Sequence, residues 1–343
     1  MENKDFDTIM REITGGLTGD EKYDIEYLMA QSEKYKESEY NIEIMRACYR
    51  MIYDLMPEDM KDEFSDALNK DMKGTDATLD EIQFLRYKKE YKKALKLMES
   101  LIQKCEKADV FPDDSVSEYH TFKEPFEEIL YHFIHNPEKE IRPSSIRYSE
   151  MYYQYGSLLI DLKRYDDAQK ALEKGLKWNP VSTQIAFERT ETFKLRGMME
   201  EYYQATRDIF KIAFRPSDLA RCYRNLGYYY VEKGELQVAV CCLVFSIPFS
   251  SSDLVQSELF YIYSLDHKLI MNPDMQTIQI NFKGYDIPLG PDEGVISLAY
   301  YFAKQSIEQG QKELAQYFIS ILISLLGEDI EELQELQEQI DKM

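Results

Sequence analysis

Small residues recur at fixed intervals in the middle of this chain, and their spacing restricts its fold more than any other feature. In the first such stretch the residues that stand out are Gly156, Ala168, Gly175 and the closing Pro180. Apolar residues three and four positions apart surround them, which is typical of helices with one buried face. Small side chains let two helices approach closely, and a proline ends the second helix. The stretch therefore predicts two tightly packed helices joined by a short corner.

The same spacing recurs further along the chain, which makes the helical pair one copy of a repeat. Ala239 follows Gly227 at the interval that separates Ala168 from Gly156, and Ser246 corresponds in the same way to Gly175. The interval between Gly156 and Gly227 has room for one more copy of about 34 residues. We therefore expect consecutive helical pairs that stack on one another.

Two further copies are less regular. The intervening copy spans residues 183–216, where the interval from Thr190 to Ala205 is longer than the regular one, so we expect about three extra residues in its corner, "KLRGMME". A looser copy spans residues 296–327, where Ala303 and Ala315 are separated by the regular interval.

These copies resemble the tetratricopeptide repeat, a helix-turn-helix unit with the motif W-x2-L-G-x2-Y followed by A, F, A and P. One copy carries Tyr152, Tyr155, Gly156, Leu159, Ala168, Leu172, Gly175 and Pro180 at the motif positions, and another carries Tyr223, Leu226, Gly227, Tyr230, Ala239, Leu243 and Ser246. The resemblance covers residues 149–253 and, more loosely, 254–343. It implies an all-α fold, a right-handed α-solenoid of helical hairpins. The amphipathic segment over 330–340 is expected to be a C-terminal capping helix.

The motif fades before residue 144. Tyr91 and Ala94 fit a second repeat helix, but Ile82 stands where the glycine belongs. We predict three regions: an N-terminal helical region, either degenerate repeats or a small bundle, then a divergent helical repeat with a long loop, then the repeats with their cap (1–75, 76–143 and 144–343). Helices are predicted over 6–13, from a cap at Thr18 or Asp20 to 36, and over 41–56, 60–68, 79–87, 91–102 and 124–134. Residues 107–120 are predicted to form a loop, and prolines mark a second break near 137–143.

The segment after residue 254 allows two interpretations. Ile278, Ile280 and Phe282 alternate in the manner of a β-hairpin, whereas Met275, Ile278 and Phe282 suit one face of a helix. The repeat pattern requires a second helix after the one at 254–269, so we expect a helix here. An extended linker through Ile287 and Pro288 should follow it.

Charge and cysteine content narrow the function classes. The chain has 41 Lys and Arg against 63 Asp and Glu, a formal net charge of −22, which repels nucleic acid and anionic membranes. Its five cysteines show no CxxC spacing, which favours buried free thiols in a reducing compartment. The first residues contain early acids and no long apolar core, so we expect a cytoplasmic protein.

No constellation of residues predicts a reaction or a cofactor. His132 and His135 stand three apart with Glu128 one turn before them, so they are the best candidates for a metal site. Surface or packing roles are commoner for such residues. We therefore predict no metal, no catalytic residue and no enzyme, with a metal-dependent hydrolase as a minor alternative.

A locally basic band inside the acidic chain is the best candidate for a binding site. Residues 186–226 contain eight basic residues and six acids. In the family, the first helix of each repeat lines a concave groove, and the resemblance implies that the groove-lining residues here are Arg221, Arg224, Asn225, Tyr228, Lys194, Tyr153 and Ser157. Such arginines and asparagines would hold a peptide carboxylate or backbone. Glu188 and Glu191 depart from that pattern, and the arginines would alternatively balance the chain's own acids.

The sequence thus predicts a non-enzymatic scaffold or adaptor that binds an unidentified protein or peptide through its concave groove. One alternative is a regulatory receptor for a short signalling peptide, a role that some bacterial members of the family serve. Another is a scaffold that self-associates as a homodimer.

Overall fold

The computed structural model describes residues 6–38, 40–57, 75, 77–108, 113–144 and 146–343. They are mostly helical, and the predicted all-α solenoid class is confirmed. The chain forms two compact units, each described by itself. The first consists of Met1–Thr121 and Pro137–Arg147, and the second of Phe122–Asn136 and Tyr148–Met343.

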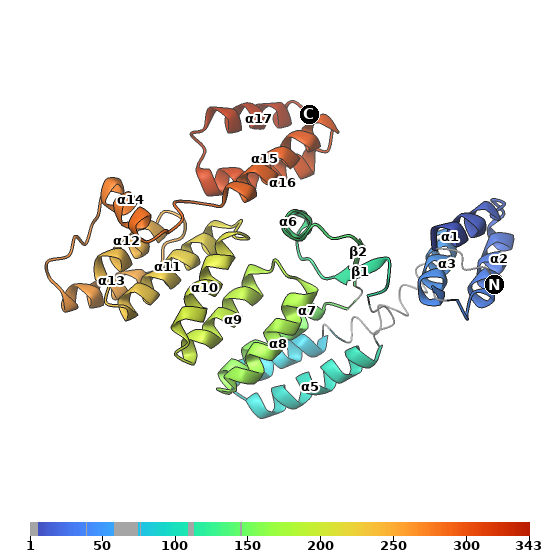
Figure 1. The fold of residues 1–343 in the computed structure, drawn as a ribbon, viewed down its shortest axis with the longest axis horizontal. Helices are drawn as coiled ribbons and strands as arrows, with labels where there is room; N and C mark the ends of the chain where they lie inside the picture. Colours follow the sequence, from blue (N-terminus) through green and yellow to red (C-terminus); the bar gives the residue numbers. More distant parts are fainter. Residues whose placement is uncertain (1–5, 39, 58–74, 76, 109–112, 145) are drawn as a thin grey trace. The chain divides into compact units, whose positions relative to one another are not determined.

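Three helices at the start of the first unit enclose a core of their own. They are α1 (Phe6–Gly15), α2 (Glu21–Lys34) and α3 (Asn41–Leu55), close to the predicted ranges (Figure 1). Asp20 caps α2 by accepting a hydrogen bond from the Tyr23 amide. The buried residues of this core are mainly aliphatic: Ile9, Ile13, Leu28, Tyr35, Ile44, Cys48 and Ile52.

Two more helices of the first unit also match their predictions. Residues 77–87 are helical, and α5 (Tyr91–Ala108) extends six residues beyond its predicted end. The helix predicted over 60–68 lies outside the described residues. Ile82 is fully buried in the position where a repeat glycine was sought.

A short parallel strand pair, β1 (Ser117–His120) and β2 (Glu140–Pro143), was not predicted. It lies in the segments where the sequence indicated a loop and a break. Ser117 pairs with Glu140 and His120 pairs with Pro143, which has no amide hydrogen and stands at the end of its strand. The Ser144 amide instead donates to the His120 carbonyl. Such short strands, each dependent on a partner far away in the sequence, leave little local signal.

The second unit contains the repeats predicted after residue 144. Its helices are α6 (Pro125–His135), α7 (Tyr148–Asp161), α8 (Tyr165–Trp178), α9 (Thr183–Leu195), α10 (Met199–Phe210), α11 (Pro216–Glu232), α12 (Leu236–Ser246), α13 (Asp253–Leu265), α14 (Met275–Gly284), α15 (Glu293–Glu308), α16 (Lys312–Leu326) and α17 (Glu331–Asp341). Each helix from α7 to α12 packs against the next one in the chain (Figure 1).

The predicted close approach at the repeat glycines is present. A Cβ atom added to Gly156 would lie 2.4 Å from Leu172 Cγ, and one added to Gly227 would lie 2.9 Å from Leu243 Cγ. Ala168 is fully buried on α8, as the motif requires. The residues that define the spacing therefore set the distance between paired helices.

The expected lengthened corner in the middle copy is wrong. α9 ends at Leu195 and α10 begins at Met199, so the corner has the same length as that between α7 and α8. Tyr202 follows Thr190 at the regular interval and occupies the buried position that had been assigned to Ala205. The additional length lies mainly in α11, which has 17 residues where α9 has 13.

The last part of the unit departs from a regular stack. The predicted helix after residue 274 is confirmed as α14, but α14 packs against α12 rather than pairing closely with α13. After an extended linker, α15 and α16 form another hairpin, with Ala303 and Ala315 fully buried. The predicted final helix is α17, which packs on α16 through Leu336 and Ile340.

Helix α6 is tied to several repeats of its unit. The Phe126 ring contacts Phe214, before α11, and Phe318 on α16. Glu127 is 2% exposed and accepts hydrogen bonds from the Lys123 amide and from Asn179 Nδ2 at 2.8 Å. Burial raises the pKa of the Glu127 carboxyl, and these hydrogen bonds oppose that effect.

Candidate functional site

The predicted binding residues lie on the first helices of successive repeats, α7, α9 and α11. The contacts described below connect one side of α9 and α11, and the charges of Lys194 and Arg224 on these helices act on Glu258 of α13. We call this set the first-helix face, defined by Phe187, Glu191, Lys194, Arg221, Arg224, Tyr228 and Glu258.

Arg221 and Arg224 are half-buried on α11, one helical turn apart. The Arg221 guanidinium lies over the Phe187 ring, 4.5 Å from its centroid, and Arg224 Nη1 donates to the Ser250 carbonyl at 3.1 Å. Burial, followed by the positive charge of Arg221, lowers the pKa of Arg224. Among the described residues, neither arginine forms an ion pair with a carboxylate.

Lys194 connects α9 to α11. Its Nζ lies 4.2 Å from the centroid of the Tyr228 ring and 3.9 Å from a Glu191 carboxylate oxygen. Burial raises the pKa of Tyr228, and Glu232 and Glu191 add to the effect. The structure therefore brings together two of the predicted residues, Lys194 and Tyr228, through a cation–π contact.

Sequence reasoning missed two members of this face, Phe187 and Glu258, and the buried Tyr202 beside it. Burial raises the pKa of the half-buried Glu258 carboxyl, while the charges of Lys194 and Arg224 oppose that rise, so its side chain lies near both. Tyr202 approaches from α10, where its ring contacts Tyr228 edge to face. Glu258 follows Arg224 by one repeat period, roughly 34 residues, so the period would have found it. Tyr202 carries no such signal.

The other predicted residues have different surroundings. Asn225 Nδ2 donates to Thr206 Oγ1 at 3.4 Å, which directs it towards α10. Tyr153 is half-buried on α7, with Lys123 Nζ 5.9 Å from its ring centroid, and Ser157 is half-buried one turn further along.

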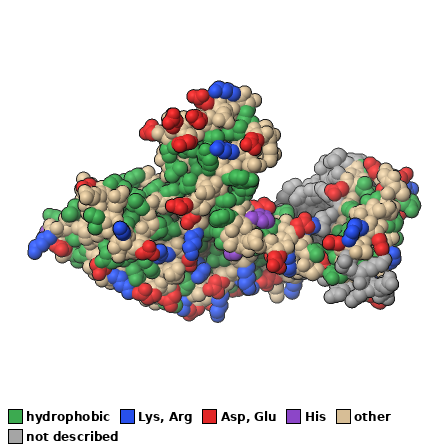
Figure 2. Space-filling view, turned by 45° about the horizontal axis from the view of Figure 1, so that its top comes forward, with side chains coloured by type: hydrophobic (Ala, Val, Ile, Leu, Met, Phe, Trp, Pro, Cys, Tyr) green, Lys and Arg blue, Asp and Glu red, His purple; other side chains and the backbone are tan. Residues whose placement is uncertain are grey.

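Four other members of the basic band are paired with carboxylates. Arg196 pairs with Asp166, Arg207 with Asp286, Lys211 with Asp208, and Arg215 with Glu124 and Asp218. Figure 2 likewise shows acidic and basic side chains interspersed over one face of the molecule. The interpretation that arginines balance the chain's acids thus holds for these residues and does not extend to Arg221 and Arg224.

The histidines do not form a metal site with neighbouring ligands. His132, His135 and Glu128 are exposed on α6, and His135 stacks on Tyr131 with ring centroids 4.8 Å apart. Within the described part of the chain, no three His, Cys, Asp or Glu side chains are grouped to hold a metal ion. None of the helices in that part is long and apolar enough to cross a membrane.

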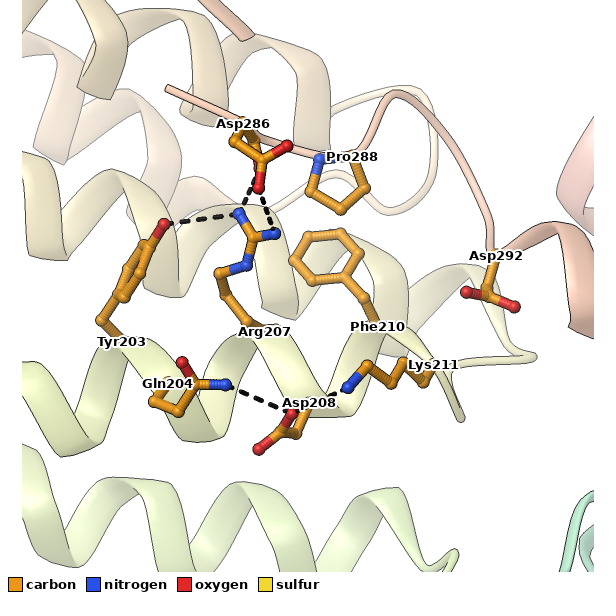
Figure 3. Close-up of a pocket in the computed structure, with 9 residues that line it drawn as sticks. All are labelled: Tyr203, Gln204, Arg207, Asp208, Phe210, Lys211, Asp286, Pro288 and Asp292. Atoms are coloured by element: carbon orange, nitrogen blue, oxygen red, sulfur yellow. Dashed lines mark hydrogen bonds and ion pairs between the residues drawn. The ribbon is translucent and has the colours of Figure 1, made fainter. Parts of the chain in front are cut away.

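A hollow of about 540 Å³ lies beside α10 and the linker that precedes α15 (Figure 3). Its charges are largely satisfied within the protein, since Arg207 bonds Asp286 and Tyr203, and Asp208 accepts from Lys211. Asp292 accepts a hydrogen bond from the Gly294 amide at the start of α15. These bonds attach the linker to α10. They also satisfy most of the charged groups around the hollow, so few remain to bind a ligand.

Comparison with known proteins agrees with the repeat geometry. Residues 149–182, which include α7 and α8, match the family model of the tetratricopeptide repeat. The search of curated proteins found no match.

Two solved structures are similar to the chain, each with 14% sequence identity and a TM-score of 0.31. One is YrrB, described as a tetratricopeptide-repeat protein with an unusual peptide-binding site, where the similarity covers 80% of this chain and 97% of the other. The second is a tetratricopeptide-repeat protein from Parabacteroides merdae, with 98% of each chain covered. Residues 149–182, with the close approach of α7 and α8 at Gly156, therefore form a tetratricopeptide repeat.

Proposed function

We propose that the protein is a non-enzymatic scaffold or adaptor that binds a protein or peptide through the first-helix face. Tetratricopeptide repeats are in general protein-interaction scaffolds. The observation that carries the specific proposal is the partial burial of Arg221 and Arg224 and the absence of an ion pair for either among the described residues. Both are partly withdrawn from water, and within the described part of the chain neither forms an ion pair with a carboxylate, although the chain has an excess of acids. The charge of Glu258 acts on Arg224 but does not outweigh burial and the charge of Arg221, so a partner carboxylate would add favourable counter-charge.

The surroundings of the two arginines favour a peptide ligand over a small ion. The partly exposed Tyr228 ring provides aromatic surface next to the charges, and the buried Phe187 and Tyr202 rings pack behind Arg221 and Tyr228. Tyrosine and arginine dominate the energetics of protein interfaces. Lys194, on α9, adds a third positive charge to the face. Asn225, Tyr153 and Ser157 would extend the contact along α11 and α7.

We also propose a cytoplasmic location. All five cysteines are free and buried, and burial raises the pKa of Cys48 to about 11, which keeps it in the unreactive thiol form. Such thiols suit a reducing compartment.

The test is capture of partners from a native lysate by the tagged full-length protein and by Arg221→Glu/Arg224→Glu. Lys170→Glu/Lys177→Glu provides a control with the same change of charge at two positions on α8, away from the first-helix face. Circular dichroism should first show equal helical content. Partners held by the wild type and the control but lost from the arginine variant are expected. Equal capture by all three proteins would refute the assignment of the first-helix face.

A further inference from the structure

Helix α13 adds an apolar surface next to the basic residues. Val255 and Ile262 are fully buried on the side that faces the unit, and Glu258 lies at the edge of the first-helix face. At about 100° per residue, the positions four before, three after and seven after Glu258 lie within roughly 60° of it. Those positions hold Leu254, Tyr261 and Leu265, which we call the α13 strip.

All three side chains of the α13 strip are exposed, by 71%, 56% and 51% for Leu254, Tyr261 and Leu265. The next helix, α14, packs against α12, and the strip remains open. A large apolar surface exposed beside polar residues is typical of a binding surface.

The charges around the strip indicate what would cover it. The positive charges of Arg221 and Arg224 attract an anion. The negative charge of Glu258, next to the strip, repels one. An acidic side chain would therefore settle over α11, and only an uncharged, apolar side chain would be favoured over α13. A second copy of this chain, with a net charge of −22, meets general electrostatic repulsion.

We infer that the first-helix face and the α13 strip together recognise a peptide segment that pairs an Asp or Glu with a large apolar residue. The carboxylate binds Arg221 and Arg224, and the apolar side chain covers Leu254, Tyr261 and Leu265. The strip lies on the same side of α13 as Glu258, on which the charge of Arg224 acts, and an extended chain rises about 3.3 Å per residue. The two side chains of the peptide therefore stand a few residues apart. This inference rests on the proposed peptide-binding function and specifies its ligand.

The experiment selects displayed random peptides of roughly a dozen residues, a span that covers both surfaces, on the full-length protein. Peptides that also bind Arg221→Gln/Arg224→Gln are removed beforehand. We expect the enriched peptides to contain the acidic and apolar pair. In synthetic versions, replacing the acid by its amide or the apolar residue by serine should each weaken binding about tenfold, measured by fluorescence anisotropy.

Two sets of variants separate the two subsites. In Leu254→Ser/Leu265→Ser, the serine-substituted peptide should bind as well as its parent, while the preference for the acid remains. In the arginine variant, the preference for the acid should disappear. Met275→Ser/Ile280→Ser, at positions on α14 that are 50% and 65% exposed, is the matched control and should bind like the wild type.

The possible outcomes test the peptide motif separately from the proposed peptide-binding function. Acidic peptides that bind through the arginines without regard to their apolar residue would overturn the inference and leave the proposed function standing. Absence of any enrichment, or enrichment of peptides without acids, would contradict both. A dimer in light scattering that Leu254→Ser/Leu265→Ser abolishes would assign the strip to a second copy and refute the peptide.

Discussion

The Tyr317 hydroxyl, on α16, donates a hydrogen bond of 3.1 Å to the Glu124 carboxylate, 193 positions earlier in the chain. The other oxygen of Glu124 lies 2.5 Å from Arg215 Nη2, just before α11. One carboxylate at the start of α6 therefore joins two distant parts of the second unit. Phe126 follows it and packs between Phe214 and Phe318.

Replacing this carboxylate should loosen the attachment of α6. Glu124→Ala removes the acceptor shared by Arg215 and Tyr317, both of which are about half-buried. We expect the free energy of unfolding to fall by about 1–2 kcal/mol, because the pair is partly screened by solvent. Urea denaturation measures the change. Glu128→Ala, at an exposed position on the same helix, should have little effect, and equal losses in both variants would contradict this role of Glu124.

The repeat glycines should tolerate no side chain. Gly156→Ala places a Cβ 2.4 Å from Leu172 Cγ, which is too close without movement of the paired helices. We expect a loss of about 1–3 kcal/mol in thermal or urea unfolding, with a smaller loss for Gly227→Ala. Gly284→Ala is the control, since no atom lies within 4 Å of its added Cβ, and it should be neutral or stabilising by about 0.5 kcal/mol. A neutral Gly156→Ala would show that the helices are less tightly packed.

The linker before α15 depends on one buried phenol. The Tyr223 hydroxyl donates to the Pro288 carbonyl at 2.9 Å and accepts from the Gly290 amide at 2.8 Å. Tyr223→Phe leaves both backbone groups without this partner, so we expect a loss of about 1–2 kcal/mol and faster proteolysis within residues 285–292. Tyr261→Phe alters an exposed hydroxyl and serves as the control. Unchanged cleavage of Tyr223→Phe would argue against this attachment.

Glu258 should make stability depend on pH. Burial raises its pKa in the folded protein above the unfolded value, so between the two values the folded state binds more protons. The free energy of unfolding should therefore fall as the pH rises through this window. Glu258→Gln should remove that contribution and give a higher melting temperature than the wild type at pH 7, with a smaller difference at low pH. A lower melting temperature at pH 7 would mean that attraction to Lys194 and Arg224 outweighs burial.

The same substitution should affect the proposed ligand. Without the negative charge of Glu258, an acidic peptide meets less repulsion beside Arg224. We expect Glu258→Gln to bind such peptides more tightly than the wild type at neutral pH, as measured by fluorescence anisotropy. Glu293→Gln, at the start of α15, should leave the affinity unchanged.

Sequence reasoning located most helices of the second unit because each buries a stripe of apolar residues with a helical period. It failed at the corner between α9 and α10, where Tyr202 replaces the small residue that the motif led us to seek. The motif places a small residue at this buried position, so a search for alanine does not find the tyrosine that occupies it. The candidate site was found only in part, since Lys194, Arg221, Arg224 and Tyr228 were named, whereas Glu258 was not.

The sequence by itself determined the helical hairpins and their close approach, because short-range periodicity and the absence of a side chain at Gly156 and Gly227 act between residues near in the chain. Only the tertiary structure decided which arginines have partners, where α6 attaches and why α13 exposes an apolar strip. These features depend on side chains that meet across tens to hundreds of positions, such as Glu124 with Tyr317. No local sequence pattern predicts such contacts, because each one depends on how all the helices between the two residues stack.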